Sequence, residues 1–444
     1  MSKIYKVLTG LILASLILAA CAPAATEEPV EPGLASFTDN PWTNGEDLSG
    51  TTVIVFGAFA DEEASRFEEA MAPFEEATGI EVTYEGSQSF ETVIVTKIEG
   101  GDPPDLAGFP QPGLMAQFAS DAVDITSMTD MGTLQNQYAQ SWLDMATIDG
   151  KMVGIWHRAT IKSLVWYPPA AFASAGYEIP ANWEDMIALS DKMVADGHTP
   201  WYGPMESGPA TGWVGTDWIE DIMLRTTSLE NYDMWTTGEL PFSSPEVKRA
   251  WELMGQILLN DDYVFGGTTT TLTASFFDSG KPLLEDPPDA FLVHQGSAMA
   301  GWLDPIPTVG PEGQLNFFGF PSIDSEYGTP ALVAGDIYSV FNDRPEVRAL
   351  VRYMITSESL ESWIKTGGIL SPHKDIANNL DWFPTADRVA MEILLNAGDN
   401  VRFDGGDLMP QAVGQGTFWT GVVDYINGGD LDTILADIDA SWPR

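Results

Sequence analysis

The apolar and polar positions that begin near residue 50 follow a strand and helix alternation. Thr52–Gly57 is a short apolar run bounded by glycine, which predicts a buried strand. An amphipathic helix is expected over 61–77, because acidic residues fill its first turn. Residues 80–84 alternate as a strand does, a helix follows over 90–99, and the turn at 100–106 leads into another strand. This order implies parallel pairing with right-handed crossovers, and therefore an α/β fold.

The alternation resumes in the second half of the chain. Residues 163–167 predict a strand, and Asn182 is placed to cap a helix that runs to about Ala195. Further helices are expected over 215–225, 245–259, 346–356 and 430–440. The roughly 400 residues after the N-terminal segment are too many for one simple core. We therefore expect two α/β lobes rather than one large sheet.

The N-terminal segment has the layout of a secretory signal peptide. Two lysines precede an apolar run over 7–20, which is too short to span a membrane as a helix. The run ends at Cys21, the sole cysteine, and its last four residues resemble the bacterial lipobox, in which that cysteine is lipidated. We expect residues 1–20 to be removed, and residues 21–47 to hold the lipid anchor and a flexible linker rich in Pro, Ala and Glu. The alternatives are a soluble secreted protein with an incidental cysteine, or a short core helix.

The charge balance narrows the choice of partners. The chain carries 20 basic and 65 acidic residues, a net charge of −45. Nucleic acid and anionic lipid surfaces would be repelled, so we expect no nucleic-acid partner and contact with the membrane only through the lipid anchor. The acidity is explained by solubility outside the cell, by a calcium site or by a salty habitat, and composition does not separate these.

Several short stretches carry a resemblance to a known family. They lie at 77–82, 97–105, 183–186, 297–302 and 418–419. Their order and spacing, from about residue 50 to the end, are similar to those of the extracellular solute-binding proteins of ABC importers. Within these proteins the chain resembles the maltose-type sugar-binding group, and most closely its α-glucoside-binding subgroup.

This resemblance implies a periplasmic-binding-protein-like (type II) fold, in which two lobes are joined by hinge strands around a central ligand cleft. Lobe one would comprise 48–158 plus 338–372, and lobe two would comprise 159–337 plus 373–444. The chain would cross between the lobes near 155–161, 333–339 and 370–375. The resemblance also implies that the two lobes close on the ligand by a hinge motion.

Four candidate ligand residues lie in loops, where polar and glycine neighbours make a core position less expected. Sugar recognition needs aromatic faces for the pyranose ring and polar groups for its hydroxyls. Trp302 and Trp419 match stacking positions of the maltose-type proteins. Trp213 and Glu206 share a loop rich in glycine, from which the carboxylate could accept sugar hydroxyls. The alternatives are tryptophans that pack within their own lobe and an ordinary solvated glutamate.

Further candidates lie on lobe one and at the predicted crossings. Phe109 and Gln111 occupy the stretch where the family often places an aromatic and polar pair. The acid and arginine of the maltose binder are missing there, which argues against maltodextrin as the ligand. Asp336 lies inside an apolar run and so needs a partner, which is either a ligand or a residue such as Arg158. Arg158 itself is either a ligand donor or part of a hinge salt bridge.

The expected function is that of a lipid-anchored receptor, on the cell surface or in the periplasm. It would be a monomer that binds an oligosaccharide, an α-glucoside by resemblance, and delivers it to the transmembrane subunits of an ABC permease. No cofactor is expected, and a zinc site is not expected either because the four histidines lack ligand spacing, whereas the calcium alternative stays open. Motifs of metalloproteases, serine hydrolases and P-loop enzymes are absent. The alternative functions are a glycoside hydrolase with paired carboxylates and a structural surface lipoprotein.

Overall fold

The computed structural model describes residues 40–397 and 400–443, and its larger sheet combines strands from residues 52–161 with two strands from residues 331–403. The strand order is β11-β10-β3-β1-β2, with β6 paired to β10. The bounds are β1 Thr52–Gly57, β2 Glu81–Gly86, β3 Leu106–Phe109, β6 Ile155–Ile161, β10 Ala331–Val340 and β11 Val401–Phe403. Strands β2 and β3 run parallel to β1, whereas β10 runs antiparallel to β3 and β6. The predicted α/β class is confirmed.

Helix α2 (Asp61–Thr78) shows how the local sequence produces the first lobe's core. Three acidic residues in its first turn oppose the positive end of the helix dipole. The helix ends at Gly79, whose φ of 68° is left-handed and suits glycine. Phe67, Met71 and Phe74 lie on one face and are fully buried against the sheet. Helices α3 (Phe90–Glu99), α14 (Pro345–Met354) and α15 (Glu361–Thr366) contribute to the same core.

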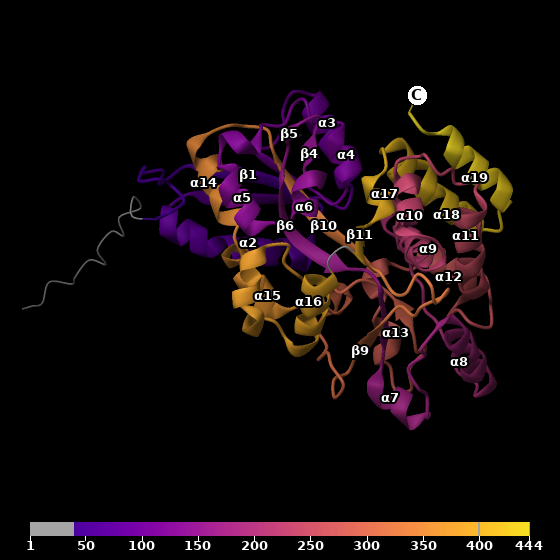
Figure 1. The fold of residues 1–444 in the computed structure, drawn as a ribbon. Coiled ribbons are helices and arrows are strands. Elements are labelled where there is room, and N and C mark those ends of the chain that lie inside the picture. Colours follow the sequence, from indigo (N-terminus) through magenta and orange to yellow (C-terminus); the bar gives the residue numbers. More distant parts are fainter. Residues whose placement is uncertain (1–39, 398–399, 444) are drawn as a thin grey trace, which may run out of the picture.

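A second core lies across the molecule (Figure 1). Its helices are α8 Trp183–Ala195, α9 Trp213–Thr226, α11 Pro245–Leu258, α18 Trp419–Ile426 and α19 Leu431–Ala440. They lie beside a three-stranded sheet of order β8-β7-β9, with bounds β7 Leu164–Tyr167, β8 Val293–His294 and β9 Asn316–Gly319. The predicted helices are present with ends shifted by a few residues at most. Asn182 caps α8 as expected, because its side chain accepts a hydrogen bond from Asp185 N.

The two cores meet along β6 and β10. These strands pair antiparallel, with Arg158 opposite Asp336 and a shift of register directly after Asp336. A further bridge joins Ala159 to Leu370, so a third segment runs alongside the first two. The predicted lobe boundaries stay a prediction, but Ile376, Phe383 and Met391 pack into the first core, whereas the prediction grouped them with lobe two.

No helix within 40–397 and 400–443 is long and apolar enough to cross a membrane. The predicted signal peptide, Cys21 and most of the linker lie outside the described residues.

Candidate functional site

A cavity of about 320 Å³ opens where the two cores face each other. Its lining includes Phe59 and Glu63 from the first core and Trp213 and Trp419 from helices of the second. Strands β6 and β10 cross its floor through Arg158 and Asp336. Ligand sites of proteins fall in this size range, at its lower end, and they favour interfaces between domains.

One wall of the cavity is aromatic. The Trp302 ring lies 5.1 Å from Phe276 at an interplanar angle of 87°, and 5.8 Å from Phe277. Trp213, at the first position of α9, lies 5.1 Å from the same Phe276 ring. Trp419 begins α18 and is only 4 % exposed. The three tryptophans predicted from the sequence all line the cavity, and they offer apolar faces suited to the C–H face of a sugar ring.

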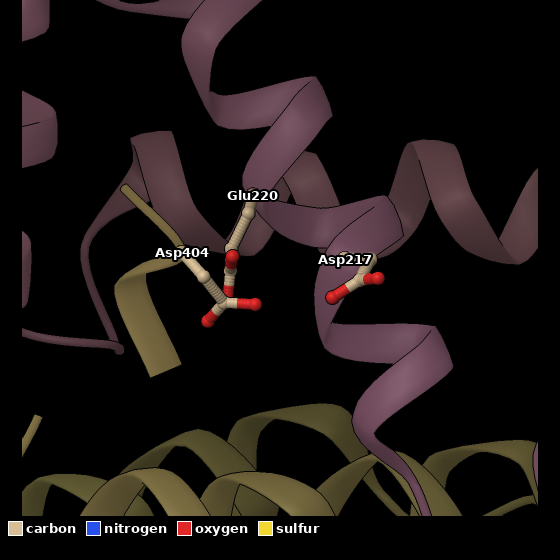
Figure 2. A group of neighbouring side chains, drawn as sticks. All are labelled: Asp217, Glu220 and Asp404. Carbon is tan, nitrogen blue, oxygen red and sulfur yellow. The ribbon is translucent and has the colours of Figure 1, made fainter. Parts of the chain in front are cut away.

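Lys162 holds together a buried group of carboxylates on the side of the second core. Its Nζ lies 2.7 Å from Asp217 Oδ1 and also contacts Asp404 Oδ2. Asp217 and Glu220 lie on α9, whereas Asp404 caps α17 (Gly405–Leu408), so two segments far apart in sequence converge (Figure 2). Carboxylate oxygens of these three acids lie within 4.8 Å of one another. Lys162 therefore supplies the positive charge that this group needs.

Burial controls the protonation of this group. Desolvation opposes the charge of Lys162, but Asp217 and Asp404 outweigh it and hold the pKa of the ammonium well above its usual value. Desolvation, and then the charge of Asp404, raises the pKa of Glu220 well above its usual value. Asp407 has its pKa raised in the same way. One lysine faces several acids, so full ionisation would leave an excess of negative charge. The raised pKa values of Glu220 and Asp407 favour their protonated forms, which reduces that excess.

Arg158 is the second buried cation at the cavity. Its Nε donates to Asp336 Oδ2 at 2.7 Å and its Nη1 donates to Glu63 Oε1 at 2.8 Å. The guanidinium also lies over the Phe59 ring at 4.4 Å. Asp336 and Glu63 outweigh desolvation and raise the pKa of Arg158, whereas desolvation raises the pKa of Asp336. The sequence left open a ligand role or a salt bridge for Arg158 and Asp336. The structure shows the salt bridge, and both residues also line the cavity.

The three remaining predicted site residues do not all line the cavity. Gln111 and Glu206 both line the cavity. Gln111 donates from Nε2 to Glu91 Oε1 at 3.1 Å, whereas Glu206 accepts from Gly208 N at 2.8 Å. Phe109 departs from the prediction: it is fully buried in β3, its ring packs against Phe90 at 5.4 Å, and it does not line the cavity. Phe109 is the last residue of β3, a strand inside the sheet, and its side chain packs into the first core, which the family position alone did not show.

Several cavity residues were missed by the sequence reasoning. Lys162, Asp404 and Asp407 carry its densest charge, and Phe276 and Phe277 complete the aromatic wall. Lys162 offered a signal, because it is a lone cation between the apolar residues of β6 and β7. Asp404 and Asp407 flank two glycines, but nothing local separates them from the many solvated acids.

Comparison with known proteins gives the family. The profile of the bacterial extracellular solute-binding proteins matches residues 60–361. The chain is 42 % identical over 444 residues to the osmoprotective compounds-binding protein GgtB of Synechocystis, with 100 % of both chains covered. It is 38 % identical over 413 residues to the α-glucosides-binding periplasmic protein AglE of Rhizobium meliloti, which covers 90 % of this chain and 88 % of that protein.

The fold is also similar to that of a solved bacterial solute receptor. The crystal structure of AcbH, a bacterial solute receptor with a substrate preference for β-D-galactopyranose, superposes with a TM-score of 0.74. The match covers 88 % of this chain and 98 % of AcbH at 19 % sequence identity, which shows the two-lobed type II binding-protein fold. The chain therefore belongs to the bacterial extracellular solute-binding proteins of ABC importers, and it is a binding protein rather than an enzyme.

Proposed function

We propose that this protein is a lipid-anchored receptor that binds a small neutral α-glucoside in the cavity between its lobes. The observation that carries the proposal is the pairing of an aromatic wall around Trp302 with a cavity rich in hydrogen-bond acceptors. A sugar presents apolar C–H faces to the first and hydroxyl donors to the second. The volume of about 320 Å³ favours a ligand of one or two rings over a long oligosaccharide.

The relatives support the same class of ligand. AglE is named for α-glucosides and GgtB for osmoprotective compounds. Small neutral solutes with many hydroxyls satisfy both descriptions. Ligand contacts with both lobes would favour the closed form, which would then dock on the transmembrane subunits of the permease.

The binding test is titration calorimetry on the protein begun at Ala22, against maltose, trehalose, sucrose, isomaltose and a set of xylo- and cello-oligosaccharides. Micromolar or tighter binding of an α-glucoside, with no product released on incubation, is the expected result. Binding of β-linked sugars alone would overturn the α-glucoside assignment, and slow cleavage would revive the hydrolase alternative.

Anionic sugars should be rejected. Among the described residues that line the cavity, both cations already have two carboxylate partners each: Lys162 has Asp217 and Asp404, and Arg158 has Glu63 and Asp336. A carboxylate on the ligand would meet further acids without a free cation, a like-charge contact that costs several kcal/mol. We expect maltobionic acid to bind about 100-fold more weakly than maltose, in parallel titrations at two salt concentrations. Equal affinities would show that a cation in the cavity is free to pair.

Trp302→Ala should weaken sugar binding roughly tenfold, since the ring face lost is comparable to one aromatic contact. Trp302 is partly exposed and sits in a short 3₁₀ turn, Met299–Trp302, so the melting temperature should change little. Trp419→Ala is the less clean variant, because Trp419 is nearly fully buried at the start of α18 and its removal also leaves a void there. Unchanged affinity in Trp302→Ala would remove this residue from the site.

The lipid anchor is tested separately from binding. Cys21→Ser should move the protein from the membrane fraction to the soluble extracytoplasmic fraction, as read by immunoblot, and leave sugar affinity unchanged. A protein that stays in the membrane fraction after this substitution would contradict the anchor.

A further inference from the structure

Gln295 is a cavity residue that neither the sequence pattern nor the aromatic wall accounts for. It directly follows β8 and lines the cavity, and it is only 2 % exposed. Its backbone is held on both sides, since its N–H donates to Leu164 O at 3.1 Å and its carbonyl accepts from Trp166 Nε1 at 2.9 Å. The side chain therefore starts from a fixed backbone position.

The amide of Gln295 has a defined orientation. Its Oε1 accepts a hydrogen bond from Gly296 N at 2.7 Å. The Nε2 group, which carries two N–H donors, is buried and has no hydrogen-bond partner. Reversing the amide would lose the bond to Gly296, so the donor end stays unpartnered. An unpaired buried donor costs about 1–3 kcal/mol, which calls for a partner that the protein itself does not provide.

Gln111, which lines the same cavity, shows the opposite polarity. Its Nε2 is engaged by Glu91, and its Oε1 is buried without a partner. Two residues that line the cavity thus carry an unpartnered amide donor and an unpartnered amide acceptor. A hydroxyl group both donates and accepts, so a polyhydroxylated solute satisfies both amides at once.

Resting on the proposed function, we propose that Gln295 is a ligand-binding and specificity-determining residue, which donates from Nε2 to an oxygen of the bound sugar. The two cations of the cavity are already paired with acids. Gln295 then becomes a main source of donors to ligand oxygens. A site built on such a donor discriminates strongly against analogues that lack the accepting oxygen.

The test compares wild type with two substitutions and one control. Gln295→Glu keeps an oxygen to accept from Gly296 and replaces the donor with an acceptor, whereas Gln295→Met removes both. Binding of maltose, trehalose and sucrose is measured by calorimetry, and folding by thermal melting. We expect Gln295→Glu to lose about 100-fold and Gln295→Met about tenfold in affinity. Gln140→Met, at an exposed glutamine that does not line the cavity, should bind as wild type.

A double-variant cycle separates direct contact from a structural effect. Monodeoxy analogues of the bound sugar are titrated against wild type and Gln295→Met. The analogue that lacks the accepted oxygen should bind wild type about tenfold more weakly and should lose nothing further in the variant. Unchanged sugar affinity in both Gln295 variants, or equal losses for every analogue, would overturn the inference alone. A wild type that binds neither these three sugars nor isomaltose would overturn the proposed function and this inference with it.

Discussion

Lys162→Met should lower the free energy of unfolding by about 3–5 kcal/mol, the range for removing one partner of a buried ion pair. The ammonium contacts Asp217 and Asp404, whose side chains are each only 3 % exposed. Methionine has nearly the same length and packs beside Trp213, whose ring lies 5.1 Å from the ammonium. The expected loss therefore comes from two carboxylates left without a counter-charge rather than from a change of volume.

Chemical denaturation at pH 7 measures this loss directly. Lys192→Met is the matched control, since Lys192 pairs with Asp196 on the exposed side of α8 and its removal should change little. Adding Asp404→Asn to Lys162→Met should recover part of the lost stability, because it removes one of the unpaired charges. Full stability in Lys162→Met would mean that protons, not the lysine, neutralise these acids.

The order of elements could be predicted from the sequence because it depends on local periodicity. The strand at Thr52–Gly57 and the helix that ends before Gly79 follow from apolar runs, first-turn acids and a glycine stop. Family resemblance then placed Trp302 and Trp419 at the cavity, which they line. These predictions required no knowledge of which distant segments meet.

The charged part of the site does require that knowledge. Lys162 contacts Asp404 across 242 positions of sequence, and Arg158 contacts Asp336 across 178. Among 65 acidic residues, nothing local marks Asp404 as buried, because its burial follows from the return of β11 to the sheet beside β10. The burial of Phe109 could not be predicted from local sequence either, because Phe90 and Phe118 contact its ring only in the folded chain.

Glu220→Gln should make the protein progressively more stable than wild type as the pH rises. Burial raises the pKa of Glu220 far above the value of about 4.3 that it has in the unfolded chain. Above that pH the folded protein holds a proton that the unfolded chain has released, so the free energy of unfolding falls as pH increases. The glutamine amide is always neutral and escapes this penalty. Its Oε1 still accepts from Gly406 N, as the Glu220 oxygen does at 2.9 Å.

The readout is the difference between the two stability curves from pH 4.5 to 8, not either curve alone. His157 and His373 are buried with lowered pKa values, and they impose the opposite slope as the pH falls below about 6.5. They are common to both proteins, so the difference cancels them. The advantage of Glu220→Gln should grow by up to about 1.4 kcal/mol for each pH unit until the folded carboxyl ionises. A constant difference across this range would mean that Glu220 is ionised in the folded protein throughout. Lys162 would then stabilise the charge of Glu220 as well as the charges of its two contacts, Asp217 and Asp404.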